Sequence, residues 1–316
     1  MSQEETQAIQ ALKDIAMEGI KEQRRARRWG IFFKLFFVLY ALIALFALLG
    51  GGSSKEKLST AAEITAVIDL NGVIMDGGEI NAETILPSLK EAFEDKKTKG
   101  VLLRINSPGG SPVQAGLIND EIRRLKALHK DIPVYAVVSD ICASGGYYIA
   151  VAADKIYADK ASIVGSIGVR MDNFGLVGLM EKLGVQRRLY TAGANKGMLD
   201  PFLPENPAQV QHVQTMLNAT HQQFINVVKQ GRGDRLQNNP DIFSGLFWTG
   251  EEALKLGLID GLGSDTFVAR DVIKAEEMVN FTNEKDIFQR LTDRVESSAH
   301  AAMRSMLNEA SAPQLY

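Results

Sequence analysis

The sequence predicts an α/β fold built around a buried parallel sheet. Three apolar runs rich in β-branched residues, at 64–70, 101–106 and 132–138, have the length and composition of strands. Amphipathic helical segments at about 82–95 and 112–129 separate them. This alternation is typical of βαβ units.

A long apolar stretch at residues 29–50 precedes this series and predicts one transmembrane helix. A basic cluster at 24–28 comes before it, so the positive-inside rule assigns residues 1–28 to the cytoplasm and the rest of the chain to the extracytoplasmic, or periplasmic, side of an inner membrane. The alternative is a cleaved signal peptide, but the leading segment is long and contains acids. An uncleaved anchor is favoured. Residues 51–61, glycine- and serine-rich at their start, read as a linker to the folded domain at 62–282.

Further elements follow the third strand. A short strand is expected at 155–157, a helix at 176–183 and another strand at 187–190. A stripe of apolar residues with helical spacing predicts a long helix at 207–229, and residues 247–260 read as a short capped helix followed by a strand. Residues 283–316 predict an amphipathic C-terminal helix and a tail.

The turn after the third strand is the first candidate for chemistry. Ser144 stands between an apolar strand and Gly145-Gly146, with an apolar segment resuming at once. Such a strand–turn–helix arrangement resembles a nucleophile elbow, where backbone N–H groups at a helix start hold an oxyanion. A plain serine N-cap is the alternative reading.

A second glycine turn, Asn106 to Pro112, follows the second strand at the edge where α/β folds bind ligands. It lacks the spacing of a phosphate-binding loop. Gly109 and Gly110 would instead offer an unobstructed N–H to an oxyanion.

A serine nucleophile needs a base, and no histidine–aspartate pair stands near these turns. Lys196 lies among small, uncharged residues, a setting in which dehydration lowers the pKa of an amine. An ordinary exposed loop lysine is the alternative interpretation. Ser166, in a turn between the two, could relay a hydrogen bond to that amine.

Composition excludes other classes. The net charge of −3 gives no reason to expect nucleic acid as a partner. The one cysteine, Cys142, reads as a small buried residue, and the four histidines, at 129, 212, 221 and 300, read as solvated. No metal and no cofactor are predicted.

Together the motifs resemble the signal peptide peptidase A family, membrane-anchored bacterial Ser-Lys proteases, in its short single-repeat form. The resemblance covers about 62–282 and rests on five motifs in order: Ser107–Gly110, Ala143–Tyr148, Gly165–Gly168, the Lys196 turn to Phe202, and Thr249–Asp260.

The resemblance implies a crotonase/Clp-protease-like fold with Ser144 as nucleophile, Lys196 as general base and Ser166 orienting the lysine. Backbone N–H groups of Gly110 or Gly109 and of Gly145 would form the oxyanion hole. Apolar residues beside the glycine turns predict small or aliphatic substrate side chains, and the substrate contacts expected are Ile141, Ala143, Ile163 and Val164.

The expected partners are peptides, such as remnant signal peptides or other apolar membrane-associated segments, and further copies of the chain in a closed ring. The amphipathic stripes at 207–229 and 287–307 would support that ring, and Lys196 could then serve a neighbour's Ser144. Two alternatives remain open: a crotonase-like acyl-CoA enzyme, and a membrane scaffold with a dead site.

Overall fold

The computed structural model describes residues 3–50 and 61–283. The chain divides into two compact units, Met1–Leu58 and Ser59–Tyr316. Most of the predicted linker at 51–61 and of the predicted C-terminal helix and tail at 283–316 lies outside the described residues.

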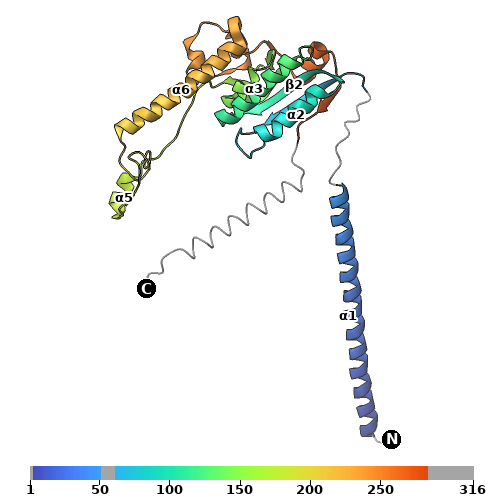
Figure 1. Cartoon of the computed structure of the whole chain (residues 1–316). Coiled ribbons are helices and arrows are strands. Elements are labelled where there is room, and N and C mark those ends of the chain that lie inside the picture. Colours follow the sequence, from blue (N-terminus) through green and yellow to red (C-terminus); the bar gives the residue numbers. More distant parts are fainter. Residues whose placement is uncertain (1–2, 51–60, 284–316) are drawn as a thin grey trace. The chain divides into compact units, whose positions relative to one another are not determined.

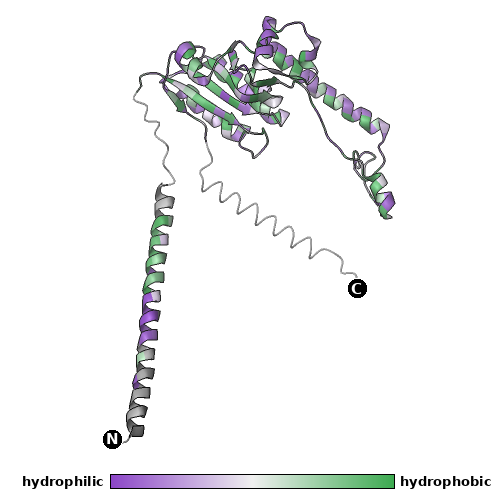
Figure 2. Cartoon of the chain, turned by 180° about the vertical axis from the view of Figure 1, so that it is seen from behind, coloured by the Kyte–Doolittle hydropathy of each residue, from purple (hydrophilic) through white to green (hydrophobic). Residues whose placement is uncertain are grey.

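The described residues of the first unit form the helix α1 (Gln3–Gly50). Figure 2 shows a hydrophilic stretch of α1 followed by a hydrophobic one. In the hydrophobic stretch the side chains of Leu35, Phe37 and Tyr40 are 65 %, 64 % and 64 % exposed. Within the described part of the chain, no helix carries an apolar run long enough to cross a membrane. The predicted span at 29–50 includes residues 45–50, whose side chains lie outside the described part.

The second unit is built on a mixed, mostly parallel sheet (Figure 1). Its centre consists of β1 (Ile64–Asn71), β2 (Thr98–Ser107) and β3 (Val134–Ala143), which pair in parallel. The helices α2 (Ala82–Glu94) and α3 (Pro112–Leu128) connect them. The α/β class and the three predicted strands are therefore confirmed.

β3 changes partner along its length. Residues 135–138 pair with β4 (Lys155–Ala158), whereas residues 141–143 pair with β5 (Ile163–Gly165). The switch occurs at Ser139 and Asp140, where the register between β2 and β3 also breaks. The remaining strands are β6 (Phe247–Thr249), antiparallel to β5, β7 (Gly261–Leu262) on β4, and β8 (Met278–Asn280) on β1. As a result β3 ends beside β5 rather than β4.

Each face of the central strands is buried in a different cluster. Alternate residues such as Ala66, Leu103 and Ala136 join the main core, together with residues of α2, α3 and α4 (Gly145–Ala150). Their neighbours, among them Val67, Leu102 and Val137, pack on a π-helical segment at Val268–Ile273. Strands buried on both faces explain the continuous apolar runs in the sequence.

Residues 170–206, called the arm here, leave this core. They include α5 (Val177–Leu183), which buries none of its residues, and they lead into α6 (Pro207–Arg232), the predicted long helix (Figure 1). The strand predicted at 187–190 is wrong, because this exposed segment has no strand beside it in the described part of the chain. The short elements that complete the unit are η1 (Gly233–Arg235), η2 (Pro240–Phe243), α7 (Gly250–Lys255) and α8 (Asp265–Phe267).

A buried ion pair fixes the last turn of α6. Arg232, 1 % exposed, donates from Nη1 to Oδ2 of Asp260 over 2.7 Å and from Nε to the Gly257 carbonyl over 2.8 Å. Asp260 also accepts from the Ile156 N–H and from Arg235. Burial raises the pKa of the Asp260 carboxyl, but the hydrogen bond from Arg232 and the positive charge of Arg232 lower it by more. The pKa of Asp260 therefore lies below its usual value.

Asp260→Asn should therefore destabilise the fold by about 3–5 kcal/mol at pH 7, because Arg232 would stay buried without its counter-charge. The depressed pKa makes this stabilisation present above the carboxyl's unfolded-state pKa and lost as pH falls through the folded value. Urea unfolding at several pH values should show the gap between wild type and variant shrinking in acid.

The control is Asp234→Asn, an exposed carboxylate two residues after Arg232. It should change the free energy of unfolding by less than about 0.5 kcal/mol. An Asp260→Asn protein as stable as this control at pH 7 would contradict the role of the pair.

Candidate active site

Ser144 joins β3 to α4 in a strained conformation. Its φ and ψ are 52° and −121°, and positive φ is rare for residues other than glycine. The Ser144 N–H donates to the Gly165 carbonyl over 2.8 Å, and its carbonyl accepts from the Tyr148 N–H over 2.9 Å. The hydroxyl makes no capping bond to α4. The conformation thus presents the side chain at a helix start without using it as a cap.

The helix behind Ser144 is rigidly held. Every residue of α4 is buried. Tyr147 donates its hydroxyl to the Leu258 carbonyl over 2.6 Å, and Asn119 of α3 donates its side-chain amide to the Tyr148 carbonyl over 2.6 Å. Burial raises the pKa of the Tyr147 hydroxyl, which keeps it a neutral donor.

The turn after β2 lies against Ser144. A Cβ on Gly109 would stand 2.7 Å from the Ser144 Cβ and 2.7 Å from the Gly145 nitrogen, so only glycine fits there. The Gly109 N–H donates to Ser107 Oγ over 3.2 Å. Gly109 therefore provides clearance for the serine and has no free N–H.

The backbone nitrogen of Gly110 lies close to Gly145. A Cβ on Gly145 would lie 3.3 Å from the Gly110 nitrogen. Neither N–H has an acceptor among the described residues. Two unpaired backbone donors next to the Ser144 turn are the kind of groups that bind a developing oxyanion.

Ser166 directly follows β5, the strand that pairs with the end of β3. Ala143 pairs with Gly165, so Ser144 and Ser166 each follow one member of that pair on adjacent parallel strands. Ser166 also has a positive φ, 52°, and its N–H donates to the Leu246 carbonyl over 2.8 Å. The structure brings the two predicted serines together.

Lys196 lies elsewhere, in an exposed turn of the arm. Its backbone N–H bonds to Gly193, and its amine makes no hydrogen bond or ion pair with any described residue. Within this chain the structure gives no contact between Lys196 and either serine.

The four predicted substrate contacts are placed unequally. Ile141 and Ile163 pair across β3 and β5, and Ile163 is 38 % exposed. Ala143 is nearly buried beside Ser144. Val164 is fully buried in the main core with its partner Cys142, because alternate residues of β5 face opposite sides. Val164 therefore offers no surface to a substrate.

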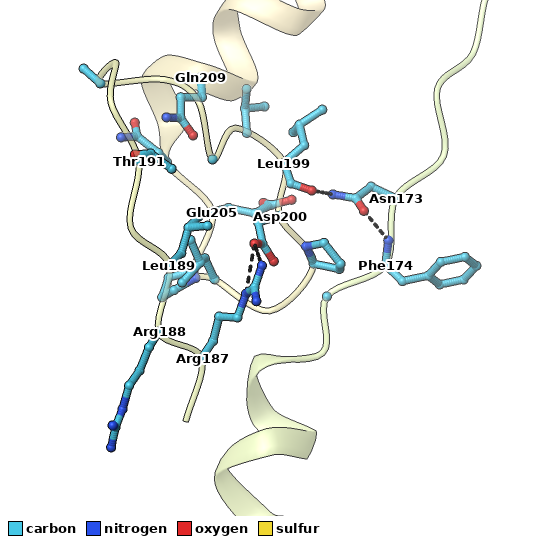
Figure 3. A pocket seen from close by; sticks show the side chains of 18 of the residues that line it. Asn173, Phe174, Arg187, Arg188, Leu189, Thr191, Leu199, Asp200, Glu205 and Gln209 are labelled. Atoms are coloured by element: carbon cyan, nitrogen blue, oxygen red, sulfur yellow. Dashed lines mark hydrogen bonds and ion pairs between the residues drawn. The ribbon is translucent and has the colours of Figure 1, made fainter. Parts of the chain in front are cut away.

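A pocket of about 620 Å³ opens in the arm rather than at Ser144 (Figure 3). Arg187 and Asp200 form an ion pair of 3.2 Å in its wall, while the Arg188 side chain points away (Figure 3). The Phe202 N–H and Arg187 lower the pKa of the Asp200 carboxyl. The ion pair folds the Lys196 turn back on the preceding segment.

Several known proteins are similar in sequence to this chain. The model of peptidase family S49 matches residues 126–279, which include Ser144, Ser166 and Lys196 but not the turn with Gly109 and Gly110. A putative signal peptide peptidase SppA of Enterococcus faecium is 34 % identical over 239 residues, covering 72 % of this chain and 69 % of that protein. A putative protease of Methanocaldococcus jannaschii is 34 % identical over 233 residues, covering 74 % and 73 %.

A Na⁺/H⁺ antiporter NhaA of Brucella melitensis biotype 1 is 50 % identical over 202 residues, covering 62 % of this chain and 27 % of that protein. This chain therefore spans about a quarter of that relative's length. The Enterococcus and Methanocaldococcus proteins match over most of both chains. Together with the observed fold, these matches define the class of this chain as a peptidase with an α/β domain. The chain belongs to peptidase family S49, which confirms the predicted resemblance at the level of the family.

Gly109→Ala should lower the free energy of unfolding by about 2–4 kcal/mol, because a methyl group cannot fit against Ser144 and Gly145 without displacing the turn. Gly116→Ala in α3 is the matched control, since a Cβ there meets nothing within 4 Å and alanine favours the helix by about 0.5–1 kcal/mol. Urea unfolding measures both. Equal free energies of unfolding of the two variants would show that the Gly109 turn does not pack closely against Ser144.

Proposed function

We propose that this chain is a serine endopeptidase in which Ser144 is the nucleophile. One observation carries the proposal: a serine held at positive φ, free of any capping role, lies beside the backbone of Gly110 and Gly145, whose N–H groups are unpaired among the described residues. Membership of peptidase family S49 supports it. The split pairing of β3 and the mixed sheet support a crotonase/Clp-protease-like fold for the domain.

The reaction follows the general course of acyl transfer. A neutral Lys196 amine removes the Ser144 proton, and Oγ attacks the peptide carbonyl carbon. The oxyanion accepts hydrogen bonds from Gly110 and Gly145. The intermediate then expels the amine product, which takes the proton from Lys196, and water releases the acyl group by the reverse sequence. Ser166 orients the lysine amine.

Lys196 reaches Ser144 from a neighbouring copy in this proposal. The arm that carries it exposes several large apolar side chains, including Tyr190 at 89 % and Phe174 at 77 %. A closed cyclic oligomer would cover them, dehydrate the lysine and complete the site.

The proposed substrates are remnant signal peptides or other apolar, membrane-associated peptides. The half-exposed Ile163 and its neighbour Ile141 favour small or aliphatic side chains next to the cleaved bond. We also propose that the exposed apolar stretch of α1 anchors the chain, with the basic cluster before it in the cytoplasm and the α/β domain on the other side.

Ser144→Ala should abolish both peptide cleavage and labelling by a fluorophosphonate probe, because the probe phosphonylates an activated serine. Lys196→Ala and Lys196→Arg should each lose about 10³-fold or more in kcat/KM, since a guanidinium does not act as a base. Lys182→Arg, an exchange at the end of α5, is the control and should keep wild-type kinetics. Full activity in Lys196→Arg would contradict the dyad.

Co-expression of Ser144→Ala and Lys196→Ala chains tests the shared site. Each variant alone should be inactive, whereas equal, randomly assembled mixtures should recover about a quarter of wild-type activity if the dyad spans an interface. Assays on mixtures purified with two different tags measure this recovery. An inactive mixed oligomer would place the dyad within one chain, and a fully active monomer in sedimentation would refute the ring.

A further inference from the structure

His221 on α6 contacts the backbone of another segment. The sequence predicted it to be solvated, and that prediction is wrong. Its Nε2 lies 3.1 Å from the carbonyl oxygen of Ile167, and the side chain is partly buried. A carbonyl only accepts hydrogen bonds, so Nε2 carries the hydrogen. Both the Nε2–H tautomer and the imidazolium meet this requirement, and the bond therefore persists in either charge state.

The accepting carbonyl belongs to the residue after Ser166. The segment 165–167 is held at three points: the Gly165 carbonyl by Ser144, the Ser166 N–H by Leu246, and the Ile167 carbonyl by His221. Gly165 and Ser166 both have positive φ, at 113° and 52°. A non-glycine residue stays in this region only where its surroundings impose it. His221 supplies one of these constraints.

His221 also sits on the face of α6 that meets the core. Phe224, one turn further along, packs on Tyr148 of α4 with ring centroids 5.1 Å apart, and Val228 is fully buried. The N-terminal end of the same helix follows the arm that carries Lys196. The His221 bond thus connects the helix that carries the arm directly to the Ser166 turn.

We propose that His221 is a positioning residue of the site: by holding the Ile167 carbonyl it fixes the Ser166 hydroxyl relative to Ser144 and relative to the arm. This role rests on the proposed peptidase function. His221 acts through Ser166 and does not touch the reacting atoms. The bond restrains the backbone on the side of Ser166 away from Ser144.

Two variants of His221 and one of His212 test the role in the full-length chain. His221→Leu removes the donor, and His221→Gln keeps a side-chain amide that can donate to the same carbonyl. His212→Leu, at an exposed histidine of the same helix, is the matched control. Each is assayed with a peptide substrate, alone and combined with Ser166→Ala.

His221→Leu should lower kcat about tenfold and leave KM within about twofold, because it removes transition-state positioning rather than substrate contact. His221→Gln should keep most of kcat, and His212→Leu all of it. In the Ser166→Ala background His221→Leu should cost nothing more, since the two act as one unit. Wild-type kcat in His221→Leu, or independent, multiplying losses in the double variant, would overturn the proposal.

A second measurement separates this inference from the proposed function. Trp248 of β6 packs on Gly165, where a Cβ would lie 3.1 Å from its Cδ1. The chain has one other tryptophan, Trp29, which Trp29→Phe removes. In that background His221→Leu should raise acrylamide quenching of Trp248 about twofold through local loosening, whereas His221→Gln and His212→Leu should not.

If the wild type neither cleaves peptides nor labels at Ser144, the peptidase function fails and the quenching alone decides whether His221 holds the segment. Unchanged quenching in His221→Leu would overturn the positioning role even in an active enzyme. Changed quenching that Gln does not restore would also overturn it, because the loss would then come from packing and not from the hydrogen bond.

Discussion

The positive φ of Ser144 is the constraint on which the rest of the site depends. It allows the chain to turn from β3 into α4 within one residue, and the bond from its N–H to the Gly165 carbonyl holds the turn against β5. The turn at Gly109 can approach only because it lacks a side chain. The buried bonds of Tyr147 and Asn119 keep α4 from relaxing the strain. A conformation costing about 1–3 kcal/mol is thus maintained by contacts on every side.

Much of this architecture can be predicted from local patterns in the sequence. The central strands follow from continuous apolar runs, because they are buried on both faces, and α6 follows from apolar residues at helical spacing, because it buries one face. The serine–glycine turn is visible because few residues tolerate positive φ or a backbone approach of this kind. The apolar stripe of α6 also contained a signal for His221: this residue lies between Leu217 and Phe224 at helical spacing, which indicates that it faces the core.

Other features depend on contacts that no local pattern records. β3 changes partner at Ser139 and Asp140 because it pairs with two separate strands, β4 and β5. Val164 is buried because β5, which contains it, pairs with the end of β3. Residues 187–190 have strand-like composition but no neighbouring strand, so they line the arm pocket instead. The structure gives no contact between Lys196 and Ser144 within one chain, and the spacing of the two residues along the sequence does not determine whether they meet.

The burial of Cys142 protects the residues around Ser144 from thiol oxidation and disulfide exchange. This sole thiol lies two residues before Ser144, yet it is 0 % exposed and its burial raises the pKa of the thiol well above the usual range. Oxidants and disulfide exchange act on the thiolate, which this environment suppresses. The folded domain therefore tolerates an oxidising compartment without forming mixed disulfides or sulfenic acid beside its serine. It would become vulnerable only during folding, before β3 and β5 pair.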